Sequence, residues 1–129
     1  MKDDPRYPLA LTWRRSWPGC DTHFNAIDPD RCGLSTVANI HLVTNHTPGV
    51  PDEWMWQCIA PGSDKGSVRP KMGAWRGYCP APREAAWKAE EAYRRFLDVV
   101  PADVLASAVE AAEYWRQSRE RIYAEKGMP

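Results

Sequence analysis

Apolar and polar residues alternate over several short segments of the first 80 residues, which is the pattern of a β-strand with one covered face. The clearest case is residues 53–60, where Trp54 and Trp56 share one face and Pro51 and Pro61 bracket the run. Two tryptophans on one side of a strand need a large apolar partner to cover them. We therefore expect a helix to pack on this strand.

Four more segments carry strand-like patterns. In the first of them, Leu9, Leu11 and Trp13 fall on one face. The last of them suits an edge strand, because Gly77 interrupts it and Pro80 follows it. Turn residues separate the segments, so an up-and-down antiparallel meander joins them most simply. The four segments are residues 9–15, 24–27, 36–44 and 74–79.

From Pro82 onward the spacing of apolar residues changes to three and four. Alanines, Tyr93 and Phe96 form one stripe and predict an amphipathic helix over residues 82–100, ended by Pro101. Three acid–base pairs at (i, i+4) support this helix, each with the acid on the N-terminal side. These pairs are Glu84–Lys88, Glu90–Arg94 and Glu91–Arg95.

A second helix is expected over residues 102–126, with a narrower, alanine-rich apolar stripe. Such a stripe either folds back on the first helix or pairs with another copy of the chain. In the second case Trp115, Arg119 and Ile122 are the candidate protein-interface residues, and a homodimer is the simplest assembly.

These patterns predict an α+β fold, in which a four- to five-stranded antiparallel meander packs on one helix and an additional helix follows. The length suits a single domain with its own core. We expect residues 1–8 to be a flexible arm and residues 9–100 the meander-plus-helix domain. Residues 101–129 then form the C-terminal helix, either within the same domain or as a dimerisation element.

The net charge favours no class of partner, because 17 lysines and arginines balance 17 acids. Residues 65–83, however, carry five cations and no acid. Trp75 and Tyr78 lie among these cations, and such a mixture suits phosphate contact and base stacking. The arginine pair 14–15, with tryptophans on both sides, would extend this surface; the alternative is a solvated loop. The nucleic-acid-binding candidates are Lys65, Arg69, Lys71, Trp75, Arg76, Tyr78 and Arg83.

Cysteine and histidine spacing suggests a metal site only in part. Cys20 and His23 have the spacing C-x-x-H, and Cys32 follows nearby, but no second ligand pair occurs at a familiar distance. We therefore expect no bound metal. No apolar run is long enough for a membrane span, and the first residues lack the apolar core of a signal peptide. A cytoplasmic location, with reduced thiols, is the expectation.

No catalytic constellation emerges from the sequence. Cys20 or Cys79 beside a histidine would make a nucleophile pair, but no family signature surrounds either one. The acid pairs 28/30 and 52/53 stand beside turn prolines, where carboxylates are ordinary hydrogen-bonding residues. We expect no enzyme and no cofactor. The favoured function is a binding module for a protein partner, with nucleic-acid binding as the alternative and a small enzyme or zinc-binding domain behind both.

The order of these segments resembles a layout found in small proteins of bacterial and prophage genomes, a short meander followed by a helix. The resemblance covers roughly residues 9–97 and rests on Leu11-Thr12-Trp13, Phe24-Asn25-Ala26, Ile40-His41-Leu42, Trp54-Met55-Trp56, Gly77-Tyr78 and the helix through Ala85, Ala89 and Phe96. No activity is assigned to that set, so the resemblance implies no catalytic residue. It implies an accessory or mobile-element protein that acts by binding.

Overall fold

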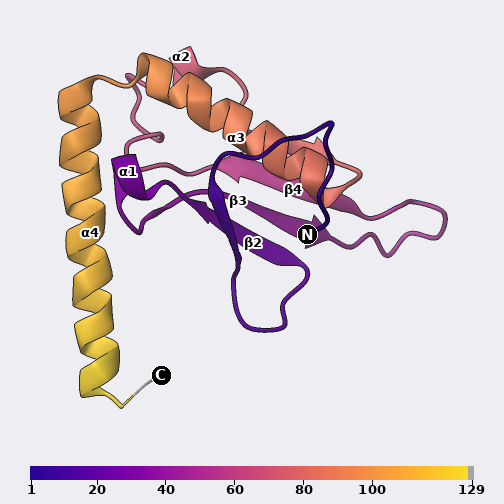
Figure 1. The fold of residues 1–129 in the computed structure, drawn as a ribbon, viewed down its shortest axis with the longest axis horizontal. Helices are drawn as coiled ribbons and strands as arrows, with labels where there is room; N and C mark the ends of the chain where they lie inside the picture. The colour runs from indigo at the N-terminus through magenta and orange to yellow at the C-terminus, as the bar shows by residue number, and fades with distance from the viewer. Residues whose placement is uncertain (128–129) are drawn as a thin grey trace.

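The computed structural model describes residues 1–127 and has a five-stranded antiparallel sheet in which each strand pairs with its neighbours in sequence (Figure 1). This arrangement confirms the α+β fold and the antiparallel meander. Each strand is close to its expected position. The strands are β1 (Thr12–Arg15), β2 (His23–Ile27), β3 (Thr36–Val43), β4 (Glu53–Cys58) and β5 (Arg76–Cys79).

Two long helices follow the sheet, as the change of period predicts: α3 (Pro82–Val99) and α4 (Ala102–Glu125). Two one-turn helices were not expected, α1 (Pro29–Cys32) and α2 (Arg69–Met72). Each has a proline in its first turn, where the missing N–H costs no hydrogen bond. In the sequence, these prolines indicated only turns and loops.

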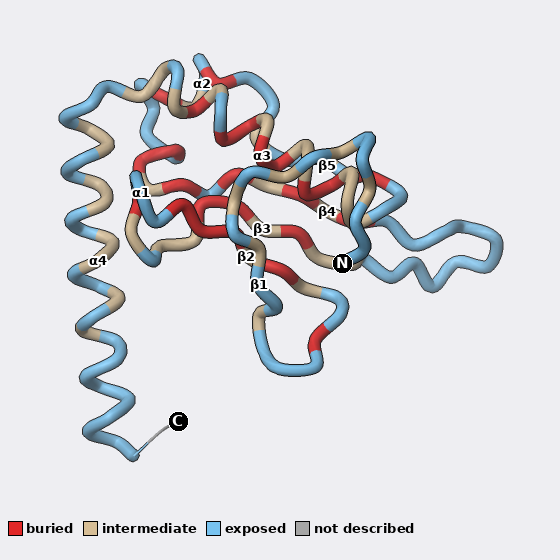
Figure 2. Tube along the Cα trace, viewed as in Figure 1, coloured by how far each residue is buried: buried red, intermediate tan, exposed pale blue. Residues whose placement is uncertain are grey.

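The core lies between α3 and one face of the sheet, as Figure 2 shows by the buried segments. Trp54 and Trp56 are buried there, in one cluster with Phe96 and the alanines of α3. Trp54 also packs near Phe24, with ring centroids 6.2 Å apart. The expectation that a helix covers the tryptophan strand is therefore confirmed.

Gly77 has a specific packing role in the edge strand β5. It pairs with Trp56 on β4, and a Cβ atom at residue 77 would lie 2.8 Å from Cζ2 and Nε1 of that indole. Any side chain at this position would therefore displace the Trp56 ring. The missing side chain leaves room for the tryptophan, in addition to suiting an edge strand.

The first strand begins three residues later than predicted, at Thr12 rather than Leu9. Ala10 and Leu11 donate their backbone N–H groups to the Glu90 carboxylate on α3, at 2.8 and 3.0 Å, instead of joining the sheet. The Trp13 indole N–H donates to the same carboxylate at 2.7 Å. Glu90 is therefore a buried clasp, meaning that its carboxylate, only 1% exposed, accepts all three of these N–H groups. It also forms the predicted ion pair with Arg94, at 4.0 Å, but from a buried rather than a surface position.

The segment expected as an N-terminal arm, residues 1–8, lies against α3. Nε of Arg83 donates to the Tyr7 carbonyl oxygen at 2.8 Å, and an Arg83 nitrogen lies 3.3 Å from an Asp3 carboxylate oxygen. The Tyr7 and Trp87 rings are 5.8 Å apart. These contacts add to the Glu90 clasp in holding the chain start beside the helix.

Helix α4 runs across the strand ends, and its C-terminal half extends past the sheet (Figure 1). None of its residues is buried, and Figure 2 shows it as intermediate or exposed along its length. Val104, Leu105 and Val109 pack against the core. The last two residues of the expected C-terminal segment, Met128 and Pro129, lie outside the described residues. Within residues 1–127, no helix has both the length and the apolar character needed to cross a membrane.

Candidate functional site

The face of the sheet opposite α3, which we call the open face, carries the most distinctive group of polar and flat side chains. Strand alternation places most core residues on one face and their sequence neighbours on the other. Ile27 and Val37, beside the irregularity in the β2–β3 pairing, are each buried together with a neighbouring strand residue. The side chains of the open face are half-buried or exposed. They include Arg14, His23, Asn25, Asn39, His41, Met55, Gln57, Arg76 and Tyr78.

Strand pairing aligns five polar residues across the whole open face. Arg14 pairs with Asn25, Asn25 with Asn39, Asn39 with Gln57, and Gln57 with Arg76. Three amides therefore stand side by side on β2, β3 and β4, with an arginine at each edge of the sheet. We call this set the amide row.

A second row lies one pleat away and consists mainly of rings. His23 pairs with His41, His41 with Met55, and Met55 with Tyr78. The His23 and His41 rings stack with centroids 5.7 Å apart, and Trp17 stacks on the other side of His23 at 6.2 Å. We call this set the ring row. Trp17, which is 57% exposed as a residue, and the exposed Tyr78 ring leave flat surfaces for a ligand.

Charge on the open face is more positive than the balanced chain total suggests. Among the strand residues, Glu53 is the single acid, and it sits at the N-terminal end of β4. Within residues 1–127, neither Arg14 nor Arg76 forms an ion pair, whereas Arg15 pairs with Asp21 at 3.1 Å. The two arginines of the amide row are thus available for an anion.

Hydrogen bonds fix some polar side chains of the open face, whereas one polar atom of this face lacks a hydrogen-bond partner among the described residues. Asn25 donates from Nδ2 to the Ser16 hydroxyl at 3.1 Å, and that hydroxyl also contacts Nδ1 of His23. Among the described residues, Oδ1 of Asn39 is shielded from solvent and has no hydrogen-bond partner. Unpaired polar atoms of this kind are rare in proteins. Burial, and next the proximity of His41, lower the pKa of His23, so its ring is neutral at neutral pH.

The structure divides the basic segment proposed from the sequence into four places. Arg76 and Tyr78 lie on the open face. Arg69 begins α2 and stacks on Trp75, with its guanidinium carbon 4.0 Å from the ring centroid, and Lys71 lies in the same helix. Lys65 lies in the loop before α2 and lines a groove beside α4. Arg83 is engaged by the N-terminal residues Asp3 and Tyr7. The set therefore does not form one continuous surface.

The sulfur and imidazole candidates do not gather into one cluster, although Cys20 Sγ lies 3.7 Å from the His23 carbonyl oxygen. Cys20 Sγ lies 3.7 Å from the Thr22 hydroxyl, and Cys32 Sγ lies 3.5 Å from the Tyr93 hydroxyl in the core. Burial raises the pKa of Cys32 and raises that of Cys58 to about 11, so both thiols stay protonated. In the described part of the chain, the four cysteines are free and buried, and no three metal-ligating side chains are grouped.

A small pocket of about 200 Å³ beside α3 contains two carboxylates. Asp28 accepts a hydrogen bond from the Tyr93 hydroxyl at 2.8 Å and pairs with Arg31 at 3.1 Å. Glu90 accepts the three N–H groups of the clasp. Burial, and next the hydrogen bonds to Cys32 and Asp28, raise the pKa of Tyr93 far above its usual range. Both carboxylates thus hold the fold together, and neither is free to act as a general base.

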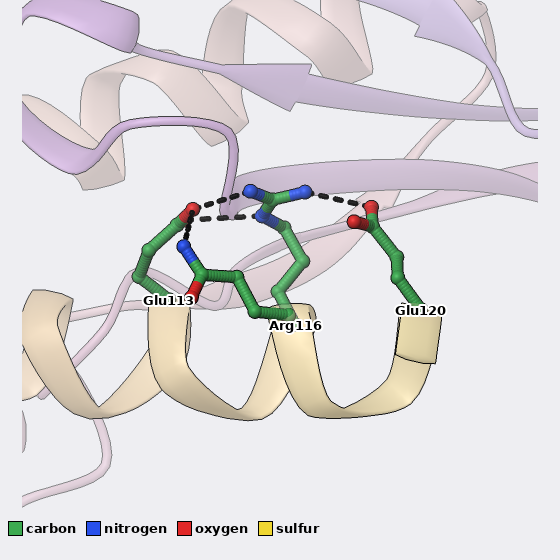
Figure 3. Close-up of polar contacts among 4 residues, drawn as sticks. Glu113, Arg116 and Glu120 are labelled. Atoms are coloured by element: carbon green, nitrogen blue, oxygen red, sulfur yellow. Dashed lines mark hydrogen bonds and ion pairs between the residues drawn. The ribbon is translucent and has the colours of Figure 1, made fainter. Parts of the chain in front are cut away.

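The interface candidates on α4 lie on its protruding half. Trp115 is 65% exposed, and Ile122 and Arg119 are exposed as well. Close to them, Arg116 is bound by Glu113 and by Glu120, the latter at 2.7 Å, as Figure 3 shows. This network lowers the pKa of Glu113, mainly through the hydrogen bond from Arg116. It stiffens a helix that has few contacts with the rest of the chain.

The amide row was missed from the sequence, although a signal for it exists. Asn25 and Asn39 occupy outward positions of predicted strands, and asparagine is depleted in strands. Two asparagines in neighbouring central strands are therefore unusual. Their alignment with Gln57 depends on strand register, which a single sequence does not reveal.

No family model matches the chain, and the curated proteins and solved structures that were searched contain no match either.

Proposed function

We propose that the protein is a non-enzymatic binding module that holds single-stranded nucleic acid on the open face of its sheet. The observation that carries this proposal is the amide row, which has at each sheet edge an arginine that forms no ion pair within residues 1–127. Arginines contact phosphates, and amides can hydrogen-bond to base edges. The rings beside this row add surfaces for base stacking.

A single strand suits this face better than a duplex does. Neighbouring strands lie about 4.8 Å apart, so the amide row is roughly 19 Å long, enough for a few nucleotides. A face roughly 19 Å across is wider than the major groove of a duplex, which is about 12 Å, whereas unpaired bases can spread over it and stack on exposed rings. Trp17 and Tyr78 offer such rings next to the amide row.

The residue types of the open face support a ligand. A sheet face that only meets water is typically rich in β-branched and mixed charged residues. Here Asn25 and Asn39 lie on central strands despite their low strand propensity, and Oδ1 of Asn39 has no partner within the described residues. The residues of this face therefore have a lower strand propensity than the sheet alone would favour, as residues of binding sites often do.

Titrating fluorescently labelled ten-nucleotide single strands and following their anisotropy tests this proposal. The double variant Arg14→Gln/Arg76→Gln should weaken binding at low salt. It should also reduce the slope of log affinity against log salt by about one for each phosphate that is no longer neutralised. Arg121→Gln, an exposed arginine on α4, is the matched control and should leave the slope unchanged. No measurable binding by the unmodified protein at low salt would refute the proposal.

A second candidate function is protein contact through α4, with another copy of this chain as the simplest partner. Its observation is the protruding half of the helix, where Tyr114, Trp115, Ile122 and Tyr123 are exposed. Exposed aromatic residues of this kind often anchor interfaces. Light scattering at tens of micromolar should give a dimer mass for the unmodified chain and a monomer mass for Trp115→Glu. A monomer in both cases would remove this candidate.

A further inference from the structure

We infer that the amide row selects the bases of the bound strand, with a preference for adenine, while the two arginines only bind its backbone. This inference rests on the proposed function and assigns a specificity role to Asn25, Asn39 and Gln57. Because phosphates are identical at every nucleotide, contacts from Arg14 and Arg76 carry no sequence information. Selectivity at this face must therefore come from the three amides and the rings.

The chemistry of a side-chain amide matches adenine. Asparagine and glutamine present an NH₂ donor and a carbonyl acceptor side by side. Adenine presents its N6 amino group next to a ring-nitrogen acceptor, and the two form a bidentate pair. In a single strand these base edges are free of a pairing partner, so the amides can reach them.

Asn25 and Asn39 are in different states, and this difference identifies Asn39 as the central residue for base contact. The Ser16 hydroxyl accepts one N–H of Asn25 and orients that amide. Asn39 lies between Asn25 and Gln57 in the row, and its Oδ1 has no partner among the described residues. Because this oxygen is shielded from solvent, a base reaches it once the Asn39 side chain turns outward, and an amino group of the base is then a suitable donor. Asn39 is thus the central amide of the row, and its acceptor is not engaged by another described group.

A comparison of homopolymers tests base selection. The unmodified protein should bind a ten-nucleotide adenine strand about tenfold more tightly than a cytosine strand, the size that one bidentate amide–base pair supports. Asn39→Asp replaces the NH₂ donor with a second acceptor and should shift the preference toward cytosine, whose N4 amino group donates to carboxylates. The adenine-to-cytosine ratio should therefore fall at least several-fold.

Asn45→Asp is the matched control. Asn45 lies in the exposed β3–β4 loop, and its Oδ1 accepts a hydrogen bond from the Thr47 N–H, which a carboxylate can also accept. This variant should keep the adenine preference of the unmodified chain. Circular dichroism on heating checks folding, and Gln57→Glu serves as a second reader variant if Asn39→Asp does not fold.

The possible outcomes distinguish base selection from nucleic-acid binding itself. Equal affinity for adenine, cytosine and uracil strands, with binding still weakened in the arginine double variant, overturns base selection and leaves nucleic-acid binding standing. A preference that the Asn39 and Gln57 variants do not change also overturns it, because the rings would then be selecting the base. Absence of binding to every strand overturns both.

Discussion

The two faces of the sheet consist of alternate residues of the same strands, yet they are built in opposite ways. On the covered face, Trp54, Trp56 and Ile40 are buried under α3. On the open face, the neighbouring residues Gln57 and Asn39 remain half-buried, with no helix over them. The covered face removes apolar area from water and so supplies most of the stability. The composition of the open face has no such explanation.

This contrast shows which positions can change to suit a ligand without loss of the fold. A change on the covered face leaves a cavity or a clash, whereas a change on the open face leaves the core intact. A ligand-reading surface can therefore be placed on the open face of a sheet whose other face is already packed. Substitutions on the two faces should differ accordingly, and most of all in their effect on stability.

Trp56→Ala should cause the largest loss, because it empties the centre of the covered face. We expect the free energy of unfolding to fall by about 3–5 kcal/mol, measured by urea titration. The indole also lies over Gly77, so the edge strand β5 would lose its packing as well. A loss below about 1 kcal/mol would place the ring outside the core.

Glu90→Ala should cost somewhat less, about 2–3 kcal/mol, because it leaves two backbone N–H groups and the Trp13 indole N–H without their charged acceptor. Residues 10–13 should then separate from α3, which faster amide exchange at Ala10 and Leu11 would reveal. Glu91→Gln on the same helix is the control, since Glu91 forms an ion pair with Arg95 at 3.7 Å and accepts no backbone N–H from the N-terminal residues within the described part of the chain. Similar losses of unfolding free energy in both variants would contradict the role of Glu90 as the acceptor that holds residues 10–13 on α3.

Gln57→Ala, one residue after Trp56, should change stability by no more than about 0.5 kcal/mol, the range of ordinary surface substitutions. The same variant should weaken nucleic-acid binding. This adjacent pair of variants is the sharpest test of the division between the faces, because both residues lie on β4 and differ in the face they occupy. A large loss of stability in Gln57→Ala would mean that the open face also carries part of the fold.

The smallest expected effect is a pH dependence that arises at the open face. The pKa of His23 is lowered from its ordinary value of 6.5 by burial and by His41, so the folded state favours the neutral ring. The unfolded chain binds the proton more readily, and stability is therefore full above about pH 6.5 and decreases as the pH falls toward the lowered folded pKa. Urea titrations at several pH values should show this decrease, and it should be smaller in His23→Gln. An unchanged pH profile in that variant would assign the effect to other groups.

Much of the fold was predictable because it depends on local patterns. Alternation around Trp54 and Trp56 predicted the central strand, and the stripe through Phe96 predicted the helix that covers it. Turn residues between short strands predicted the meander. These signals are read from neighbouring residues, and the structure confirms the α+β fold that they predict.

Contacts between distant residues were not predictable in the same way. Glu90 has the spacing of a surface ion-pair residue, and only the approach of Ala10 and Leu11, about eighty positions away in sequence, makes it a buried acceptor. The sequence likewise predicts one surface from the basic segment. In the folded chain, however, Arg69 stacks on Trp75 and Arg83 binds the N-terminal residues.

The candidate site shows most clearly what the tertiary structure decided. The sequence determined that Asn25, Asn39 and Gln57 point away from the core, because their neighbours are apolar. Whether they stand in line depends on strand register, and a slip of one residue would turn each strand's side chains to the other face. The covered face sets that register, for example where Trp56 fits over Gly77. Packing on one side of the sheet thus aligns the polar row on the other.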